Sequence, residues 1–87
     1  MVSKQITVSA VNGFHMRPAT VFAGEMSKFS SDVNIEFNNK TVNAKSVMNI
    51  IASCIKCGSQ INIVCSGEDE QAALDKAVSL IESGLGE

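Results

Sequence analysis

The sequence predicts an α+β domain, an open-faced β-sandwich in which three helices cover one face of a four-stranded antiparallel sheet in the order β-α-β-β-α-β-α. Segments with an apolar residue at every second position alternate with segments of helical spacing, and the strand-like segments are too short to favour a doubly wound parallel sheet. The 87 residues suffice for one thin core, so we expect a single domain over residues 1–87.

The N-terminal part of the chain is predicted to form a strand and then a helix. Residues 2–10 alternate polar and apolar side chains, as in a half-buried strand, and Asn12-Gly13 marks a turn. The spacing then changes, and a helix is expected to begin at about residues 15–17, with Pro18 in the first turn, where a missing N–H costs nothing. The apolar stripe of this helix comprises Ala19, Phe22, Ala23, Met26 and Phe29.

A hairpin and a short helix are predicted in the middle of the chain. Residues 33–37 and 41–43 have the alternation of strands, and Asn38-Asn39 between them is a tight-turn signal. Ser46 is expected to cap a short helix, and Gly58 has the character of a stop signal after it.

The C-terminal part is predicted to form the fourth strand and the last helix. Residues 61–65 alternate, and Ser66-Gly67 predicts the turn that follows. The acidic residues 68–70 stand where a helix dipole favours negative charge, and Gly84 is expected to end the helix. The apolar stripe of this helix comprises Leu74, Ala77, Val78 and Ile81.

Composition and charge restrict the class of protein. A net charge of -2 argues against a nucleic-acid ligand, and six basic against three acidic side chains in residues 1–67 make a mildly basic body. No apolar stretch has the length of a signal peptide or of a membrane span, and three Cys residues are an odd number for a disulfide framework. We expect a monomeric cytoplasmic protein with a surface site for an anionic ligand and for larger partner proteins.

The segment Gly13-Phe14-His15-Met16-Arg17-Pro18-Ala19-Thr20 carries the candidate chemistry. A helix N-terminus offers unpaired N–H groups and about half a positive charge, which suits a phosphate and disfavours protonation of a nearby imidazole. His15, the only His in the chain, is therefore a candidate nucleophile. Arg17 would offer a planar fork of donors to the phosphoryl oxygens.

Two other interpretations of His15 stay open from the residues alone. The first is a surface loop residue without a role, although the flanking Gly, Arg and Pro at a helix start argue against it. The second is a metal site, which is weaker because one His without nearby Cys or carboxylate supplies too few ligands.

This segment resembles the phosphohistidine signature of HPr, the family of histidine-containing carriers in the bacterial sugar phosphotransferase system. The resemblance implies that His15 accepts a phosphoryl group on Nδ1 from phospho-Enzyme I and passes it to IIA domains of sugar permeases, with Arg17 stabilising the phosphate. It also implies a cofactor-free carrier that is not an enzyme, with Met16 and Thr20 in the surface that docks partners. Phe14 and Met16 depart from the usual Leu and small residue, and Met16 bears on partner preference.

The segment Ala44-Lys45-Ser46-Val47-Met48-Asn49-Ile50-Ile51 allows two interpretations. In one, Ser46 only caps a helix whose apolar residues Val47, Met48 and Ile51 fill the core. In the other, four large apolar residues on so short a helix leave some facing outward as a docking surface. Asn49 stands where a capping box would have Glu or Gln, which weakens the first interpretation.

The same segment resembles the regulatory-serine motif of HPr from Gram-positive bacteria. The resemblance implies that HPr kinase/phosphorylase phosphorylates Ser46 with ATP, and that the product binds a catabolite-repression transcription regulator and accepts phosphate poorly from Enzyme I. It also makes Val47, Met48 and Ile51 docking residues. Regulatory paralogues of the family lack the acceptor His, so His15 counts against a binding module that acts mainly through Ser46.

The three Cys residues are better explained by packing than by a metal or redox role. Cys54-Ile55-Lys56-Cys57 has the CxxC spacing of a redox or zinc site, and Cys65 follows in the fourth predicted strand. A structural zinc site needs four ligands, and a thioredoxin-like pair opens a helix, whereas this pair is predicted to close one. We expect small, semi-buried Cys side chains without a metal or redox role.

Overall fold

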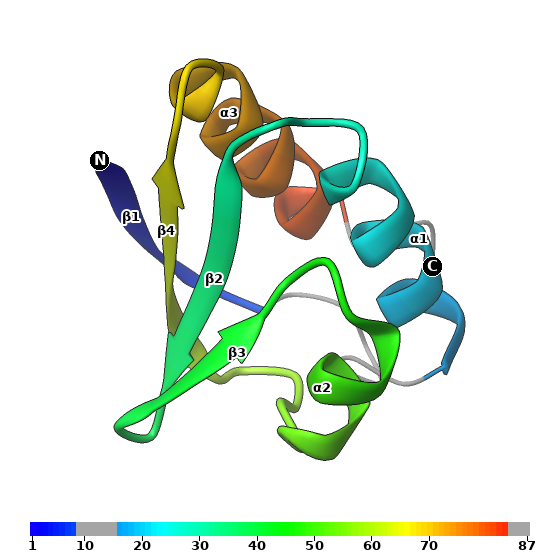
Figure 1. Ribbon diagram of the computed structural model, residues 1–87. Helices are drawn as coiled ribbons and strands as arrows, with labels where there is room; N and C mark the ends of the chain where they lie inside the picture. Colours follow the sequence, from blue (N-terminus) through cyan, green and yellow to red (C-terminus); the bar gives the residue numbers. More distant parts are fainter. Residues whose placement is uncertain (9–15, 84–87) are drawn as a thin grey trace.

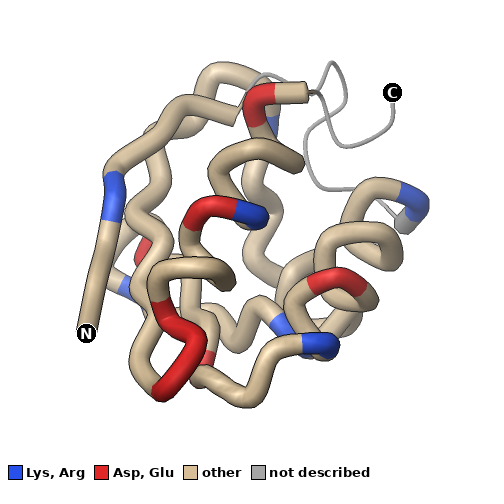
Figure 2. Tube along the Cα trace, turned by 90° about the horizontal axis from the view of Figure 1, so that it is seen from above, with Lys and Arg blue, Asp and Glu red and all other residues tan. Residues whose placement is uncertain are grey.

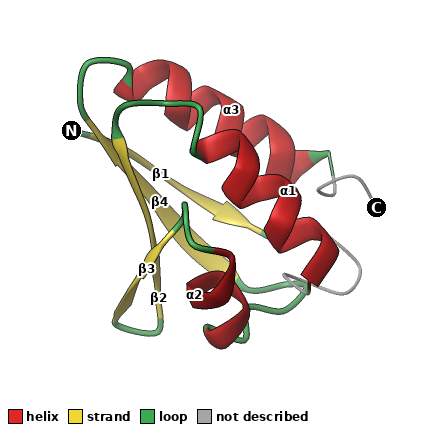
Figure 3. Ribbon diagram, turned by 45° about the vertical axis from the view of Figure 1, so that its right-hand side comes forward, coloured by secondary structure: helices red, strands yellow, loops and turns green. Residues whose placement is uncertain are grey.

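The computed structural model describes residues 1–8 and 16–83 and confirms the predicted fold class and element order. Four strands form one antiparallel sheet in the spatial order β1-β4-β2-β3, and the helices lie on one face of it (Figures 1 and 3). The elements are β1 (Val2–Thr7), α1 (Met16–Met26), β2 (Asp32–Phe37), β3 (Lys40–Asn43), α2 (Val47–Ala52), β4 (Gln60–Ser66) and α3 (Glu70–Glu82).

The core fills the space between the sheet and the helices, as the alternating and helical patterns predict. Every second residue of β2 and β4 is buried, and the opposite face of each strand is polar or partly exposed. The buried stripes of α1 and α3 match the predicted ones, except that α1 ends at Met26 and the half-buried Phe29 lies beyond it. The core residues of α1 and α3 are Ala19, Phe22, Ala23, Met26, Ala73, Leu74, Ala77, Val78 and Ile81.

The hairpin turn is confirmed, but the predicted stop of the second helix is wrong. Asn38 and Asn39 have φ of 50° and 63°, the left-handed pair that lets a two-residue turn follow the twist of β2 and β3. Helix α2 ends at Ala52, and Cys54, with φ of 58°, takes the left-handed conformation expected of a glycine. Gly58, with φ of 88°, instead turns the chain into β4, and its N–H donates to the Val8 carbonyl at 2.8 Å. The predicted turn at Asn12-Gly13 and the stop at Gly84 lie outside the described residues.

The Asp69 carboxylate joins the start of α3 to the loop that follows α1. Its Oδ2 accepts a hydrogen bond from the Ser30 N–H at 3.0 Å, and its Oδ1 accepts from the Ser31 N–H at 2.9 Å and from the Ser31 hydroxyl. Asp69 is the N-cap residue of α3, but its side chain makes no cap hydrogen bond. Its carboxylate instead accepts hydrogen bonds from the loop after α1. The sequence pattern explained Asp69 by the helix dipole alone and did not predict this contact.

The same contact explains one glycine and one pKa. The Ser31 hydroxyl, followed by the Ser30 N–H, lowers the pKa of the Asp69 carboxyl from 3.8 to about 2. Ser31 lies so close to Gly67 that a Cβ at residue 67 would stand 2.6 Å from the Ser31 Oγ. Only glycine therefore fits between this strand end and the serine.

Replacing Asp69 by Asn should lower the melting temperature and weaken the acid dependence of unfolding. The amide retains one acceptor but turns a donor toward a backbone N–H, so one bond is lost. Because the folded pKa lies below 3.8, stability due to this carboxylate is present above about pH 4 and is lost as the pH falls toward 2. Thermal unfolding at several pH values measures both effects.

The exposed Asp32 offers a matched control, since Asp32→Asn makes the same chemical change at the start of β2. Its melting temperature should stay close to that of the wild type. Equal losses in the two variants would show that Asp69 contributes only its charge and not the contact with the loop.

Candidate functional site

The N-terminal half of α1 lies beside α2, so the two segments singled out in the sequence share one side of the molecule (Figures 1 and 3). Helix α1 buries one face and exposes the other, with open positions at helical spacing. The exposed positions of its outer face are Arg17, Thr20, Val21 and Gly24.

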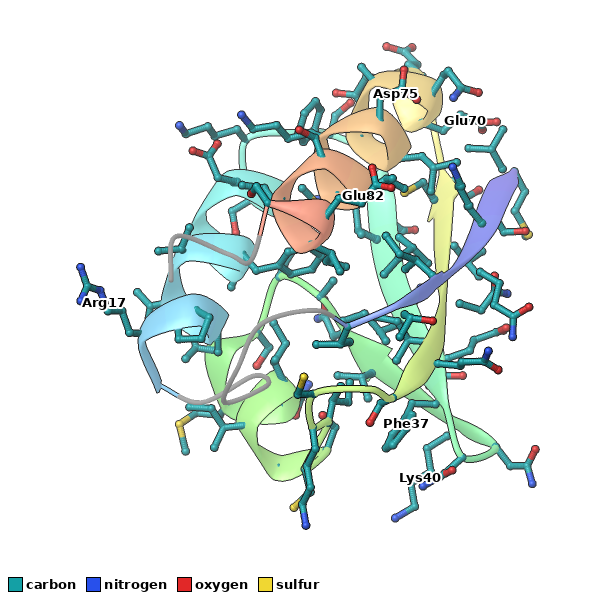
Figure 4. All side chains as sticks on the ribbon, turned by 180° about the vertical axis from the view of Figure 1, so that it is seen from behind. Arg17, Phe37, Lys40, Glu70, Asp75 and Glu82 are labelled. Atoms are coloured by element: carbon teal, nitrogen blue, oxygen red, sulfur yellow. The ribbon has the colours of Figure 1, made fainter. Side chains whose placement is uncertain are left out.

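Arg17 is the second residue of α1, and its side chain extends from the helix into solvent (Figure 4). It makes no ion pair with another residue of the described chain, and the first turn of α1 contains no acidic residue. Pro18, buried beneath it, fixes this end of the helix as predicted. The guanidinium therefore stands available to an external anion.

The structure describes the helix that follows the candidate nucleophile, and not His15 itself. His15 directly precedes Met16, the first residue of α1, but His15, Gly13 and Phe14 lie outside the described residues, as does the side chain of Met16. The structure thus gives the position of Arg17 and Thr20 and of the α1 backbone that follows His15.

Ser46 is the N-cap residue of α2, as predicted. Its backbone is extended, and its Oγ accepts a hydrogen bond from the Asn49 N–H at 3.3 Å. The Ser46 N–H donates to the Asn43 carbonyl at 3.1 Å, so the cap needs no Glu or Gln at residue 49 to satisfy that group. Ser46 is half-buried and lies at the start of the helix.

The apolar residues of α2 divide between the core and the surface. Ile50 is fully buried and anchors the helix, whereas Met48 is 70% exposed. Val47 and Ile51 are half-buried and pack against the core with part of their surface open. The interpretation in which Val47, Met48 and Ile51 fill the core is wrong for Met48, and we call these three residues the α2 patch.

Lys45 fixes the position of α2 relative to α1. Its Nζ donates a hydrogen bond at 2.8 Å to the Phe29 carbonyl, which lies just beyond the C-terminal end of α1. The Lys45 N–H also donates to the Asn43 side chain at 3.0 Å, which orders the connection from β3. No local sequence pattern predicts this hydrogen bond, because an isolated Lys is normally a solvated surface residue.

The Cys residues depart from the expected semi-buried state. Cys54 and Cys57 are exposed, and Cys65 is fully buried in β4, where burial raises the pKa of its thiol. All three are free thiols. Within residues 1–8 and 16–83, no group of three or more His, Cys, Asp or Glu side chains could hold a metal ion, and no helix is long and apolar enough to cross a membrane.

Comparison with known proteins gives consistent matches over nearly the whole chain. A family model described as "PTS HPr component phosphorylation site" matches residues 2–83. The chain is 40% identical over 82 residues to the HPr-like protein Crh of Halalkalibacterium halodurans, covering 94% of this chain and 98% of that protein. It is 37% identical over 83 residues to the phosphocarrier protein HPr of Borreliella burgdorferi, covering 95% and 96%. The crystal structure of HPr-C-His from Thermoanaerobacter tengcongensis matches 100% of this chain and 98% of its own, with a TM-score of 0.96 and 40% identity.

Two alanine substitutions separate the structural part of α2 from its surface part. Ile50→Ala should lower the free energy of unfolding by about 2–5 kcal/mol, because it empties a core position. Met48→Ala should change it by less than about 0.5 kcal/mol, because the Met48 side chain is mostly in water. Urea unfolding measures both, and a loss at Met48 as large as at Ile50 would show that Met48 is structural.

Proposed function

The chain belongs to the HPr family of phosphocarrier and regulatory proteins, and on that premise we propose that it carries a phosphoryl group on His15. The donor is phospho-Enzyme I and the acceptors are IIA domains of sugar permeases. The observation that carries the proposal is the exposed Arg17 guanidinium, without an ion-pair partner in the described chain, two residues after His15 in the first turn of α1.

The chemistry is a transfer between proteins and not a turnover of a small molecule. A neutral His15 ring nitrogen attacks the phosphorus, a P–N bond forms, and the bond from phosphorus to the donor breaks. In the second transfer the same nitrogen is the leaving group, and the acceptor forms the new bond. Arg17 stabilises the charge on the phosphoryl oxygens in both steps, and the N–H groups at the start of α1 add to this field.

The docking surface in this proposal combines the outer face of α1 with the α2 patch. Thr20 and Val21 are exposed on α1, and Met48 is the most exposed side chain of the patch. An apolar patch beside a basic residue fits a partner surface with an apolar centre and an acidic rim. We also propose that Met16, the first residue of α1, contributes to partner docking. The proposal places the carrier and its partners in the cytoplasm.

Ser46 is the proposed regulatory site, phosphorylated by HPr kinase/phosphorylase at the expense of ATP. The half-buried Ser46 directly precedes Val47 of the α2 patch, so a phosphate on it adds about two negative charges beside the docking surface. Such a charge repels an acidic partner and suits a second partner with basic groups, for which we propose a transcription regulator of catabolite repression.

A second function is supported by relatives of similar identity, the HPr-like Crh proteins. In that case the chain would be a regulatory binding module that acts through Ser46 and receives no phosphate from Enzyme I. His15 favours the carrier, because the resemblance implies an acceptor His only in carriers. Phosphorylation by the kinase together with inertness toward Enzyme I would favour the regulatory module instead.

Incubation with phosphoenolpyruvate and Enzyme I, followed by intact mass spectrometry, should show the gain of one acid-labile, alkali-stable phosphoryl group. His15→Ala should show no gain. Arg17→Glu should slow the transfer by on the order of tenfold to a hundredfold, because it removes a donor to the transferred group. Lys4→Glu, the same charge reversal on β1 at the sheet edge opposite β3 and α2, is the control and should transfer at close to the wild-type rate. A gain in His15→Ala would remove that residue from the mechanism.

Ser46→Asp should slow phosphoryl transfer from Enzyme I without weakening the fold. Asp is as good an N-cap residue as Ser, so α2 is retained while a negative charge enters beside the α2 patch. Ser46→Asn is the matched variant, since it caps equally well without charge and should transfer at the wild-type rate. Similar rates in all three proteins would exclude charge at residue 46 as the regulatory signal.

A further inference from the structure

An open groove lies between β1 and α3, away from the proposed site. It has a volume of about 800 Å³ and is lined by Val2, Ser3 and Lys4 on one side and by a stripe of α3 on the other. Strand β1 forms one edge of the sheet and β3 the opposite edge, and α2 packs beside β3. A ligand in this groove would leave α2 uncovered.

The outer edge of β1 offers unused backbone hydrogen-bonding groups. The Val8 N–H donates to the Ser59 carbonyl at 2.9 Å, in register with the β1–β4 pairing. In an antiparallel pair, alternate residues direct both N–H and C=O to the same neighbour, so Val2, Lys4 and Ile6 bond to β4 as Val8 does. Ser3 and Gln5 therefore direct their backbone groups outward, where no described residue meets them.

The α3 wall of the groove has an apolar floor and acidic side chains. Its lining residues recur at helical spacing and include Leu74, Asp75, Val78 and Glu82. Asp75 and Glu82 are two turns apart and exposed on α3, and acidic residues predominate along this helix (Figures 2 and 4). Lys4 is the one basic residue of the lining, so the two carboxylates leave the groove negative.

We propose that this groove binds an extended, basic segment of a partner protein, which pairs with β1 as a fifth strand of the sheet. Helix α3 has 13 residues and is about 20 Å long, which matches about six residues of a strand. Alternate side chains of such a segment face α3. Lys or Arg fits these positions, because its aliphatic stem covers Leu74 and Val78 while its charge reaches Asp75 or Glu82.

Titration with a synthetic peptide, acetyl-Lys-Thr-Lys-Thr-Lys-Thr-amide, tests the proposal in amide ¹H–¹⁵N spectra of the full chain. The amide signals of β1 and α3 should show saturable changes in chemical shift. The amide hydrogens of Ser3 and Gln5 should exchange more slowly with solvent. A peptide of the same composition with three Lys followed by three Thr should bind more weakly, because its charges do not alternate. A Glu-Thr repeat should not bind.

Two variants test the two walls of the groove separately. Asp75→Asn with Glu82→Gln should weaken binding of the Lys-Thr repeat about threefold to tenfold, as expected for two exposed charge pairs. Ser3→Pro removes an outward N–H, which an edge strand tolerates, and should abolish the strand pairing. Asp32→Asn with Glu36→Gln, the same change of charge on β2, is the control and should bind as the wild type does.

Any one of three results would overturn the proposal. These are equal affinity for the alternating and block peptides, wild-type affinity of Ser3→Pro for the alternating peptide, and chemical-shift changes confined to other faces of the molecule. Shifts of the same β1 amides on raising the protein concentration without peptide would assign this edge to a second copy of the chain instead.

Discussion

The contact between Asp69 and the loop after α1 holds together the two long helices that cover the sheet. Ser30 and Ser31 donate to the Asp69 carboxylate, while the neighbouring Phe29 carbonyl accepts from Lys45. One short loop is thereby bound to the start of α3 on one side and to the residue before the α2 cap on the other. In a chain with so small a core, these polar contacts supply the fixed positions that apolar packing alone leaves adjustable.

The orientation of the proposed docking surface follows from this junction. Helix α1 presents Arg17, and α2 presents Ser46 and Met48, so their relative position depends on how both helices are attached to the sheet. Ile50 anchors α2 from below, and Lys45 ties it to the end of α1. The α2 patch can stay exposed, as the proposed docking role requires, because the stability of the helix comes from other residues.

Local pattern was enough to predict the sheet, the helices and the Ser46 cap, because alternation, helical spacing and capping are properties of neighbouring residues. It did not predict the partners of Asp69 or Lys45, which lie 38 or 39 and 16 residues away and leave no local signal. The predicted helix stop at Gly58 is wrong because Cys54, not a glycine, adopts the left-handed conformation after α2. Burial of Cys65 and exposure of Cys54 and Cys57 depend on the tertiary fold and not on the CxxC spacing.

In the proposed function, the phosphoryl group resides on a ring nitrogen of His15. Phosphorus NMR of the carrier, labelled with ¹⁵N in His and phosphorylated by Enzyme I and phosphoenolpyruvate, tests it most directly. Because His15 is the only His, one phosphorus resonance coupled to one ring nitrogen is expected, and the family resemblance implies that this nitrogen is Nδ1. A phosphorus signal without nitrogen coupling, as from a phosphoserine or a phosphocysteine, would contradict it.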